Sequence, residues 1–117
     1  MKVYLYAACG TCRKALKFLA AHHIPHTIVP IREQPPTKAE LRRMLVHQGG
    51  AVRKLFNTSG QDYKRLNLKD QLPQLTTESA LALLVSNGNL VRRPFALTEK
   101  AGLVGFKEEE WTKLIAR

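Results

Sequence analysis

Apolar and polar residues alternate at the start of the chain. In VYLYA, residues 3–7, three apolar side chains would lie on one face of an extended segment and two tyrosines on the other. This period of two predicts a β-strand that ends at the turn-forming ACG of residues 8–10.

From Thr11 the apolar spacing changes to that of a helix that should end near residues 22–23. The next apolar segment, HTIVPI of residues 26–31, predicts a second strand. Strand, helix and strand with short links form a βαβ unit, so we expect parallel strands with a right-handed crossover. The apolar stripe of the predicted helix consists of Ala15, Leu16, Leu19 and Ala20.

The middle of the chain is predicted to be helical. Thr37 and Glu40 form a capping-box pattern at the start of a helix that the glycines of residues 49–50 end. AVRKLFN (51–57) predicts a short helix and QDYKRLNLKD (61–70) mixed helix and loop. A further helix should start at residue 76 or 77 and stop at residues 87–88. The predicted buried edge of the helix after Thr37 consists of Leu41, Met44, Leu45 and Gln48.

The last part of the chain returns to strands. PFALT (94–98) and LVG (103–105), joined by EKAG, predict an antiparallel hairpin. KEEEWTKLIAR (107–117) predicts a helix, with acidic residues in its first turn and basic residues in its last. Three apolar residues should dock that helix on the core: Trp111, Leu114 and Ile115.

The order of these elements defines the expected architecture. It is that of an α/β, thioredoxin-like fold, βαβ followed by ββα around a mixed sheet, with a helical insertion before the C-terminal hairpin. At 117 residues, without a linker or repeat, the chain is expected to form a single domain over residues 1–117.

The charge of the chain favours anionic partners. Nineteen Lys and Arg residues against nine Asp and Glu give a formal net charge of +10. Aromatic residues are not interleaved with the basic pairs and no nucleic-acid motif is present, so the sequence does not favour direct nucleic-acid binding. No apolar segment long enough to span a membrane and no signal-peptide pattern is found, so we expect a cytoplasmic protein without a membrane partner.

The chain has two cysteines, Cys9 and Cys12, in the sequence CGTC. Cys9 should lie at the corner where the first strand meets the first helix. There the helix N-terminus, together with Arg13, would lower its pKa and favour the nucleophilic thiolate. Cys12, one turn into the helix, could then resolve a mixed disulfide. The alternative is two small buried residues without a chemical role.

A zinc site is a further alternative, because His22 and His26 follow the two cysteines. Nine residues separate Cys12 from His22, fewer than a zinc finger uses, and they are predicted to be helical. A helix of that length keeps its ends about 15 Å apart, whereas zinc–ligand bonds are near 2 Å. The sequence therefore predicts no metal site.

The chain resembles the ArsC-like family of the thioredoxin-fold superfamily, which includes glutaredoxin-coupled arsenate reductases and the Spx/MgsR-type regulators. The resemblance spans nearly the whole chain and depends on CGTC followed at this distance by RRP, residues 92–94. It also includes YAACGTCRKALKFL, PPTKAELRRML, LFNTSGQDYKRLNLKDQL and VGFKEEEW.

The resemblance implies a role for each matching position. Cys9 matches the nucleophile, Pro94 a cis-proline facing it, and Arg93 an arginine that holds an oxyanion beside the thiolate. Asn57 stands where the arsenate reductases have a second arginine, and LVGF, residues 103–106, supplies no third. Arsenate reduction is therefore not favoured as the physiological activity. Six residues are predicted to bind substrate: Gly10, Thr11, Arg13, Asn57, Arg93 and Pro94.

Two functions remain as hypotheses. The first is a thiol-disulfide oxidoreductase, with Cys9 as nucleophile and Cys12 as resolving thiol, acting on a small oxyanion or a disulfide. It would need no bound cofactor and would take electrons from glutathione, glutaredoxin or thioredoxin. The second is a redox-switched regulator of the Spx/MgsR type, which the resemblance implies would bind the α subunit of RNA polymerase.

Overall fold

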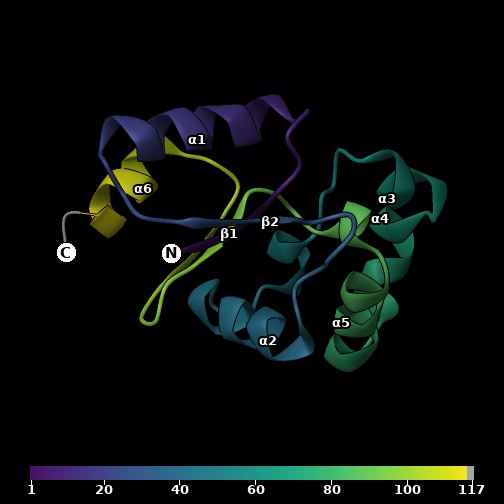
Figure 1. Ribbon diagram of the computed structural model, residues 1–117. Coiled ribbons are helices and arrows are strands. Elements are labelled where there is room, and N and C mark those ends of the chain that lie inside the picture. Colours follow the sequence, from purple (N-terminus) through teal and green to yellow (C-terminus); the bar gives the residue numbers. More distant parts are fainter. Residues whose placement is uncertain (116–117) are drawn as a thin grey trace.

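The computed structural model describes residues 1–115 and contains one four-stranded mixed sheet in the order β2-β1-β3-β4 (Figure 1). The parallel β1–β2 pair and the antiparallel β3–β4 hairpin are as predicted, and β1 also pairs with β3 in the antiparallel sense. The strands and the connecting helix are β1 (Lys2–Leu5), α1 (Gly10–Ala21), β2 (Thr27–Pro30), β3 (Phe95–Leu97) and β4 (Gly102–Val104).

The helical insertion is also observed. It begins after β2 with α2 and ends before β3, and α6 follows the hairpin. The predicted last helix, residues 107–117, is observed as α6, and its final two predicted positions lie outside the described residues. These elements are α2 (Lys38–His47), the 3₁₀ helix η1 (Val52–Leu55), α3 (Gln61–Arg65), α4 (Leu68–Gln71), η2 (Leu72–Gln74), α5 (Thr77–Ser86), η3 (Gly88–Leu90) and α6 (Glu108–Ile115).

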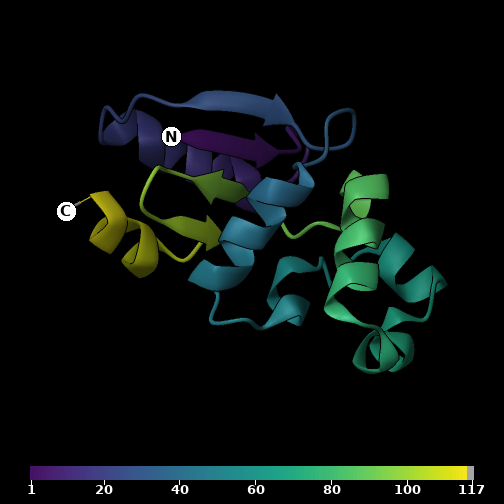
Figure 2. The same cartoon turned by 90° about the horizontal axis from the view of Figure 1, so that it is seen from below.

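The sheet separates two apolar cores. Helices α1 and α6 cover one face and α2 the other, while α3, α4 and α5 group beyond one end of the strands (Figures 1 and 2). Val3 and Leu5 pack with α1 and Trp111, whereas Tyr4 packs on the α2–α5 side. Because β1 is covered on both faces, Tyr4 is only 3% exposed. The predicted strand was also too long, since β1 ends at Leu5.

Local sequence accounts for the positions of the two long helices that flank the sheet. The capping box is present: the Glu40 N–H donates to Thr37 Oγ1 at 3.1 Å and the Thr37 N–H donates to Glu40 Oε1 at 2.9 Å. Such a cap stabilises a helix by about 1 kcal/mol. The stripe predicted for α1 was partly wrong, because Ala20 is exposed and Leu16 half-buried. The buried residues of α1 are Cys12, Ala15, Phe18 and Leu19.

Candidate active site

Cys9 is the residue that caps the N-terminus of α1. Its backbone is extended, its N–H donates to the Tyr6 carbonyl at 2.9 Å, and its carbonyl accepts from the Arg13 N–H at 3.0 Å. Gly10 and Thr11 are the first residues of the helix, so their backbone N–H groups lack partners within it. The thiol is free and half-buried. This places Cys9 at the strand-to-helix corner that the sequence predicts.

The surroundings of Cys9 favour the thiolate. Burial by itself raises the pKa of the Cys9 thiol, but hydrogen bonds to the sulfur outweigh it and leave the pKa below its ordinary value. The donors are the backbone N–H and thiol of Cys12, the guanidinium of Arg93 and the backbone N–H of Thr11. A thiolate at this position is the form that attacks sulfur.

Cys12 has the opposite character. It is 0% exposed and lies in the core between the sheet and α1. Burial is the main reason that the pKa of Cys12 is raised to about 12, and the neighbouring Cys9 raises it further. The two thiols of CGTC therefore differ in accessibility and in the direction of their pKa shifts, and Cys9 alone is both partly exposed and more easily ionised than an ordinary thiol.

The strand pairing brings Arg93 and Pro94 to the same corner. Tyr4 of β1 lies opposite Phe95 of β3, so the end of one strand adjoins the start of the other. The Arg93–Pro94 peptide bond is cis, as the resemblance implies. Tertiary pairing thus joins two segments that are more than 80 residues apart in the sequence into one site.

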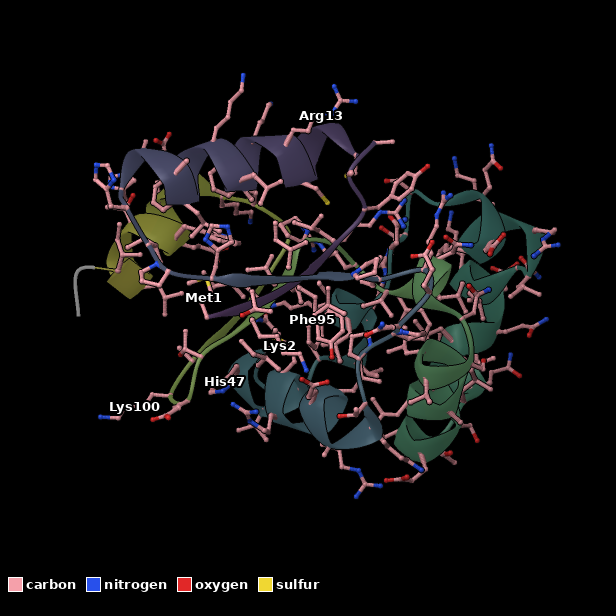
Figure 3. All side chains as sticks on the ribbon, viewed as in Figure 1. Met1, Lys2, Arg13, His47, Phe95 and Lys100 are labelled. Atoms are coloured by element: carbon pink, nitrogen blue, oxygen red, sulfur yellow. The ribbon has the colours of Figure 1, made fainter. Side chains whose placement is uncertain are left out.

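Arg13 occupies a different place from the one expected of a substrate-binding residue. Its guanidinium donates to the carbonyls of Ala7 at 3.3 Å and Ala8 at 3.2 Å. The side chain is exposed and extends away from the sheet (Figure 3). Arg13 therefore supports the loop that carries Cys9 from its outer side.

Asn57 and Arg93 line one polar cavity of about 470 Å³. Sequence reasoning did not single out three other residues of its wall, Arg32, Asp62 and Asn89. They come from the loop after β2, from α3 and from η3, and no spacing in the sequence links them. Asn57 is held by its backbone N–H, which donates to the Leu90 carbonyl at 2.7 Å.

Tyr6 was also missed as a component of the site. The guanidinium carbon of Arg32 lies 3.7 Å from the centre of its ring, and that of Arg93 lies 5.4 Å away. A cation over an aromatic face is attracted by the ring quadrupole. Tyr6, next to the turn that leads to Cys9, therefore helps to hold both guanidinium groups at the cavity.

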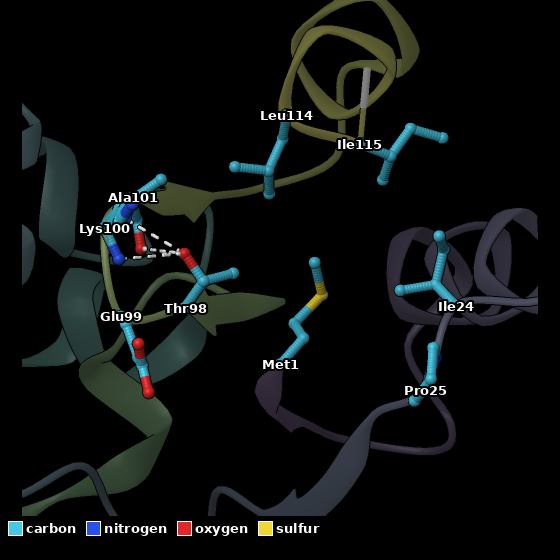
Figure 4. A pocket seen from close by; sticks show the side chains of 9 residues that line it. All are labelled: Met1, Ile24, Pro25, Thr98, Glu99, Lys100, Ala101, Leu114 and Ile115. Carbon is cyan, nitrogen blue, oxygen red and sulfur yellow. Dashed lines mark hydrogen bonds between the residues drawn. The ribbon is translucent and has the colours of Figure 1, made fainter. Parts of the chain in front are cut away.

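A second, larger hollow of about 590 Å³ lies at the other end of the molecule (Figure 4). Its wall includes Met1, Ile24, Leu114 and Ile115, and neither cysteine contributes to it. Met1 and Lys100, which line it, lie toward the opposite end of α1 from Arg13 (Figure 3).

The described residues were also searched for metal sites and membrane spans. Within residues 1–115 no group of three or more His, Cys, Asp and Glu side chains could hold a metal ion. His22 is exposed beside Phe18, and Nδ1 of His26 lies 2.7 Å from the Ile24 carbonyl. In the same part of the chain no helix is both long and apolar enough to cross a membrane.

The mixed sheet, a thiol at the N-terminus of the first helix and a cis-proline directly before β3 define a thioredoxin-like protein. Within that class the chain belongs to the ArsC family, whose sequence model matches residues 4–114. The family prediction and the fold prediction are therefore confirmed.

Individual relatives cover nearly the whole chain. It is 43% identical to the protein YusI of Bacillus subtilis, over 92% of each chain. It is 30% identical to the global transcriptional regulator Spx of Enterococcus faecalis, over 100% of this chain and 87% of that one.

Two solved structures are similar. An ArsC family related protein from Bacteroides fragilis has a TM-score of 0.92 and 47% identity, over 97% of this chain and 95% of that one. A Streptococcus mutans protein described as a possible arsenate reductase has a TM-score of 0.86 and 35% identity, over 95% of this chain and 96% of that one.

Proposed function

We propose that this protein is a thiol-disulfide oxidoreductase with Cys9 as nucleophile and Cys12 as resolving thiol. The observation that carries the proposal is the contrast between the two thiols. Cys9 is accessible with a lowered pKa, and Cys12, fully buried one helical turn away, helps to lower the pKa of Cys9. Membership of the ArsC family, which includes thiol-dependent reductases, supports the same activity.

The reaction takes two exchange steps. The Cys9 thiolate attacks one sulfur of a disulfide R–S–S–R, forms a Cys9–S–S–R mixed disulfide and releases one thiolate. Cys12 then loses its proton and attacks the Cys9 sulfur, which forms the Cys9–Cys12 disulfide and releases the second thiolate. The two protons of the protein thiols end on the two released thiols, so the substrate is reduced and the protein dithiol is oxidised by two electrons.

The protein groups around Cys9 would position the substrate. Arg93 and the backbone N–H groups of Thr11 and Cys12 act on the sulfur and would orient the group that it attacks. Asn57, which lines the cavity beside Arg93, can donate a hydrogen bond but supplies no charge. The cavity therefore lacks a guanidinium at the position where the arsenate reductases are expected to have an arginine, which argues for a disulfide rather than arsenate as the substrate.

The proposal needs no bound metal, nucleotide or flavin. A glutathione, glutaredoxin or thioredoxin thiol would return two electrons to the Cys9–Cys12 disulfide. Such donors keep thiols reduced in the cytoplasm, which is the location that we propose.

A second candidate is a redox-switched regulator, favoured by the 30% identity to Spx of Enterococcus faecalis across the whole chain. In this case the Cys9–Cys12 disulfide would change affinity for the RNA polymerase α subunit rather than turn over. The exposed basic surface, part of a net charge of +10, is suited to an acidic protein partner.

The test measures reduction of hydroxyethyl disulfide with glutathione alone as the electron supply, because glutaredoxin would itself reduce this disulfide, and reduction of arsenate with glutathione and glutaredoxin. We expect wild-type turnover on the disulfide, none in Cys9→Ser, and reduced turnover in Cys12→Ser, because glutathione can resolve the mixed disulfide in place of Cys12. Equal background rates for all three proteins would overturn the oxidoreductase. In that event, capture of purified polymerase α subunit by the oxidised but not the reduced protein would establish the regulator.

A further inference from the structure

The polar cavity beside Arg93 contains two buried atoms that lack hydrogen-bond partners in the described structure, Arg93 Nη1 and Asn89 Oδ1. One is a donor and the other an acceptor, and each faces a desolvation cost while it stays unpaired. A ligand that supplies an acceptor and a donor close together would satisfy both. An unpaired donor and acceptor in the wall of one cavity therefore indicate a binding site.

The orientation of the Asn89 amide is fixed by its neighbour. The pKa of the Asp62 carboxyl is lowered mainly by a hydrogen bond from the Asn87 side chain. A hydrogen bond from the Asn89 side chain lowers the pKa of Asp62 further. Because an ionised carboxylate can only accept, Asn89 must present its NH₂ group to Asp62. Its Oδ1 is then directed elsewhere and remains available to a donor from a ligand.

Charge selects between the ligands that carry both groups. Arg32 and Arg93 contribute two guanidinium groups to the cavity wall, and Asp62 is the carboxylate of that wall. The Asp62 charge is already compensated outside the cavity, since Arg65 Nη2 lies 3.1 Å from its Oδ1. The cavity is therefore positive overall, which favours a carboxylate over a neutral peptide group as the acceptor.

The position of the cavity connects it to the thiol. Arg93 helps to lower the pKa of the Cys9 thiol and also lines the cavity. The guanidinium of Arg32 stacks at 3.7 Å on Tyr6, three residues before Cys9, and is thus held at the wall in a fixed direction. A ligand seated in the cavity would extend from the reacting sulfur without having to displace either arginine.

We propose that this cavity binds the amino-acid end of a low-molecular-weight disulfide, its carboxylate at Arg32 and Arg93 and its ammonium or N–H at Asn89 Oδ1. The inference depends on the proposed function and adds its substrate class. The S–S bond of the seated disulfide lies at Cys9, which breaks it, keeps one half as the mixed disulfide and releases the other as a free thiol. Cys12 then releases the second half, as described above, and an external thiol restores the protein.

The test compares four disulfides that differ in charge. Glutathione disulfide carries carboxylates and ammonium groups, dithiodipropionate carboxylates alone, cystamine ammonium groups alone, and hydroxyethyl disulfide neither. We expect kcat/KM to be highest for glutathione disulfide and at least about tenfold lower for hydroxyethyl disulfide, which makes no charge-assisted hydrogen bond. Cystamine should be the poorest, because the cavity is positive.

Substitutions show which residues produce the expected order of kcat/KM among the four disulfides. Arg32→Gln should lower kcat/KM for both carboxylate-bearing disulfides about tenfold more than it lowers kcat/KM for hydroxyethyl disulfide. Asn89→Ala should lower kcat/KM for glutathione disulfide alone. Arg53→Gln removes the same charge from an exposed residue that lies outside the cavity and should leave the order of the four substrates unchanged.

Two results would overturn the inference: equal kcat/KM for the four disulfides in the wild type, or an unaltered preference in Arg32→Gln. Neither result would contradict the proposed function, which requires only that the protein reduces a disulfide with turnover. If the wild type reduces no disulfide, the proposed function fails, and binding still tests the cavity. A chemical-shift titration of the Cys9→Ser protein should then show glutathione disulfide, and not hydroxyethyl disulfide, shifting the Arg32 and Asn89 signals, and the absence of these shifts would overturn the inference.

Discussion

The two hollows at opposite ends of this molecule differ in whether buried polar atoms of their lining residues lack hydrogen-bond partners. The apolar hollow beside Met1 and Leu114 is the larger, at about 590 Å³ against about 470 Å³. The polar cavity contains two buried atoms without partners and adjoins a thiol with a lowered pKa. The apolar hollow contains neither of these features.

Cavity volume is therefore a poor guide to function in this protein. Apolar walls at the surface cost little when they are only partly covered, whereas a buried donor without an acceptor costs about 1–3 kcal/mol. A protein retains such a group when a functional contribution offsets this free-energy cost. At Arg93 the offsetting contributions would be the lowered pKa of Cys9 and the binding of a ligand.

The largest effect that should separate the two regions is trapping of a mixed disulfide at Cys9. In Cys12→Ser, treated with glutathione disulfide and no reductant, the adduct has no internal thiol to release it. Intact-mass measurement should find one glutathione per chain, whereas the wild type should lose two hydrogens and carry none. Cys9→Ser should carry no adduct on its buried Cys12, and an adduct there would show that Cys12 is accessible.

The next effect is a decline of the unfolding free energy at alkaline pH that arises from the Cys12 thiol. Its pKa is raised to about 12 in the folded state, above the ordinary value near 9 that the unfolded chain restores. Between these values the folded protein keeps a proton that the unfolded chain has lost, so this stabilisation is fully present below pH 9. It should be lost at up to about 1.4 kcal/mol per pH unit above pH 9.

Cys12→Ala isolates this contribution from that of other groups. Urea unfolding at a series of pH values from 8 to 11 should give a shallower decline of the unfolding free energy than in the wild type. Parallel curves for the two proteins would show that the Cys12 thiol ionises in the folded protein as readily as in the unfolded chain.

A smaller effect concerns the guanidinium at the polar end. Arg93→Gln removes a hydrogen bond that lowers the pKa of Cys9, so the midpoint of thiolate formation should move to higher pH. The rate of alkylation by iodoacetamide as a function of pH measures this midpoint. Arg92→Gln is the matched control, because its guanidinium packs against Gly105 and its loss should leave the Cys9 titration unchanged.

The smallest effect is expected at the apolar end. Leu114→Ala removes part of a half-buried side chain, which should lower the unfolding free energy by about 1 kcal/mol without altering the Cys9 titration. Urea unfolding and the alkylation profile together check both statements. A shift in the Cys9 midpoint as large as that of Arg93→Gln would mean that the two ends are energetically coupled.

Much of the fold followed from local sequence. The capping residues Thr37 and Glu40, the glycines after α2 and the change of period at Thr11 fix where elements begin and end, because they satisfy or limit backbone groups within a few residues. The same reasoning placed Cys9 at the helix N-terminus. The alternation in the first strand does not indicate that Tyr4 is buried, because burial of a strand on both faces depends on which helices lie above and below it.

Local sequence accounts for the order of elements, the family and the position of Cys9 at the N-terminus of α1, since CGTC and the following helix lie within one local segment. Tertiary structure alone decided the surroundings of that thiol. Arg32, Asp62 and Asn89 come from three separate segments, and only strand pairing and helix packing bring them to Arg93. Contacts between distant segments leave no periodic pattern in a sequence, because they depend on how the elements pack rather than on spacing along the chain.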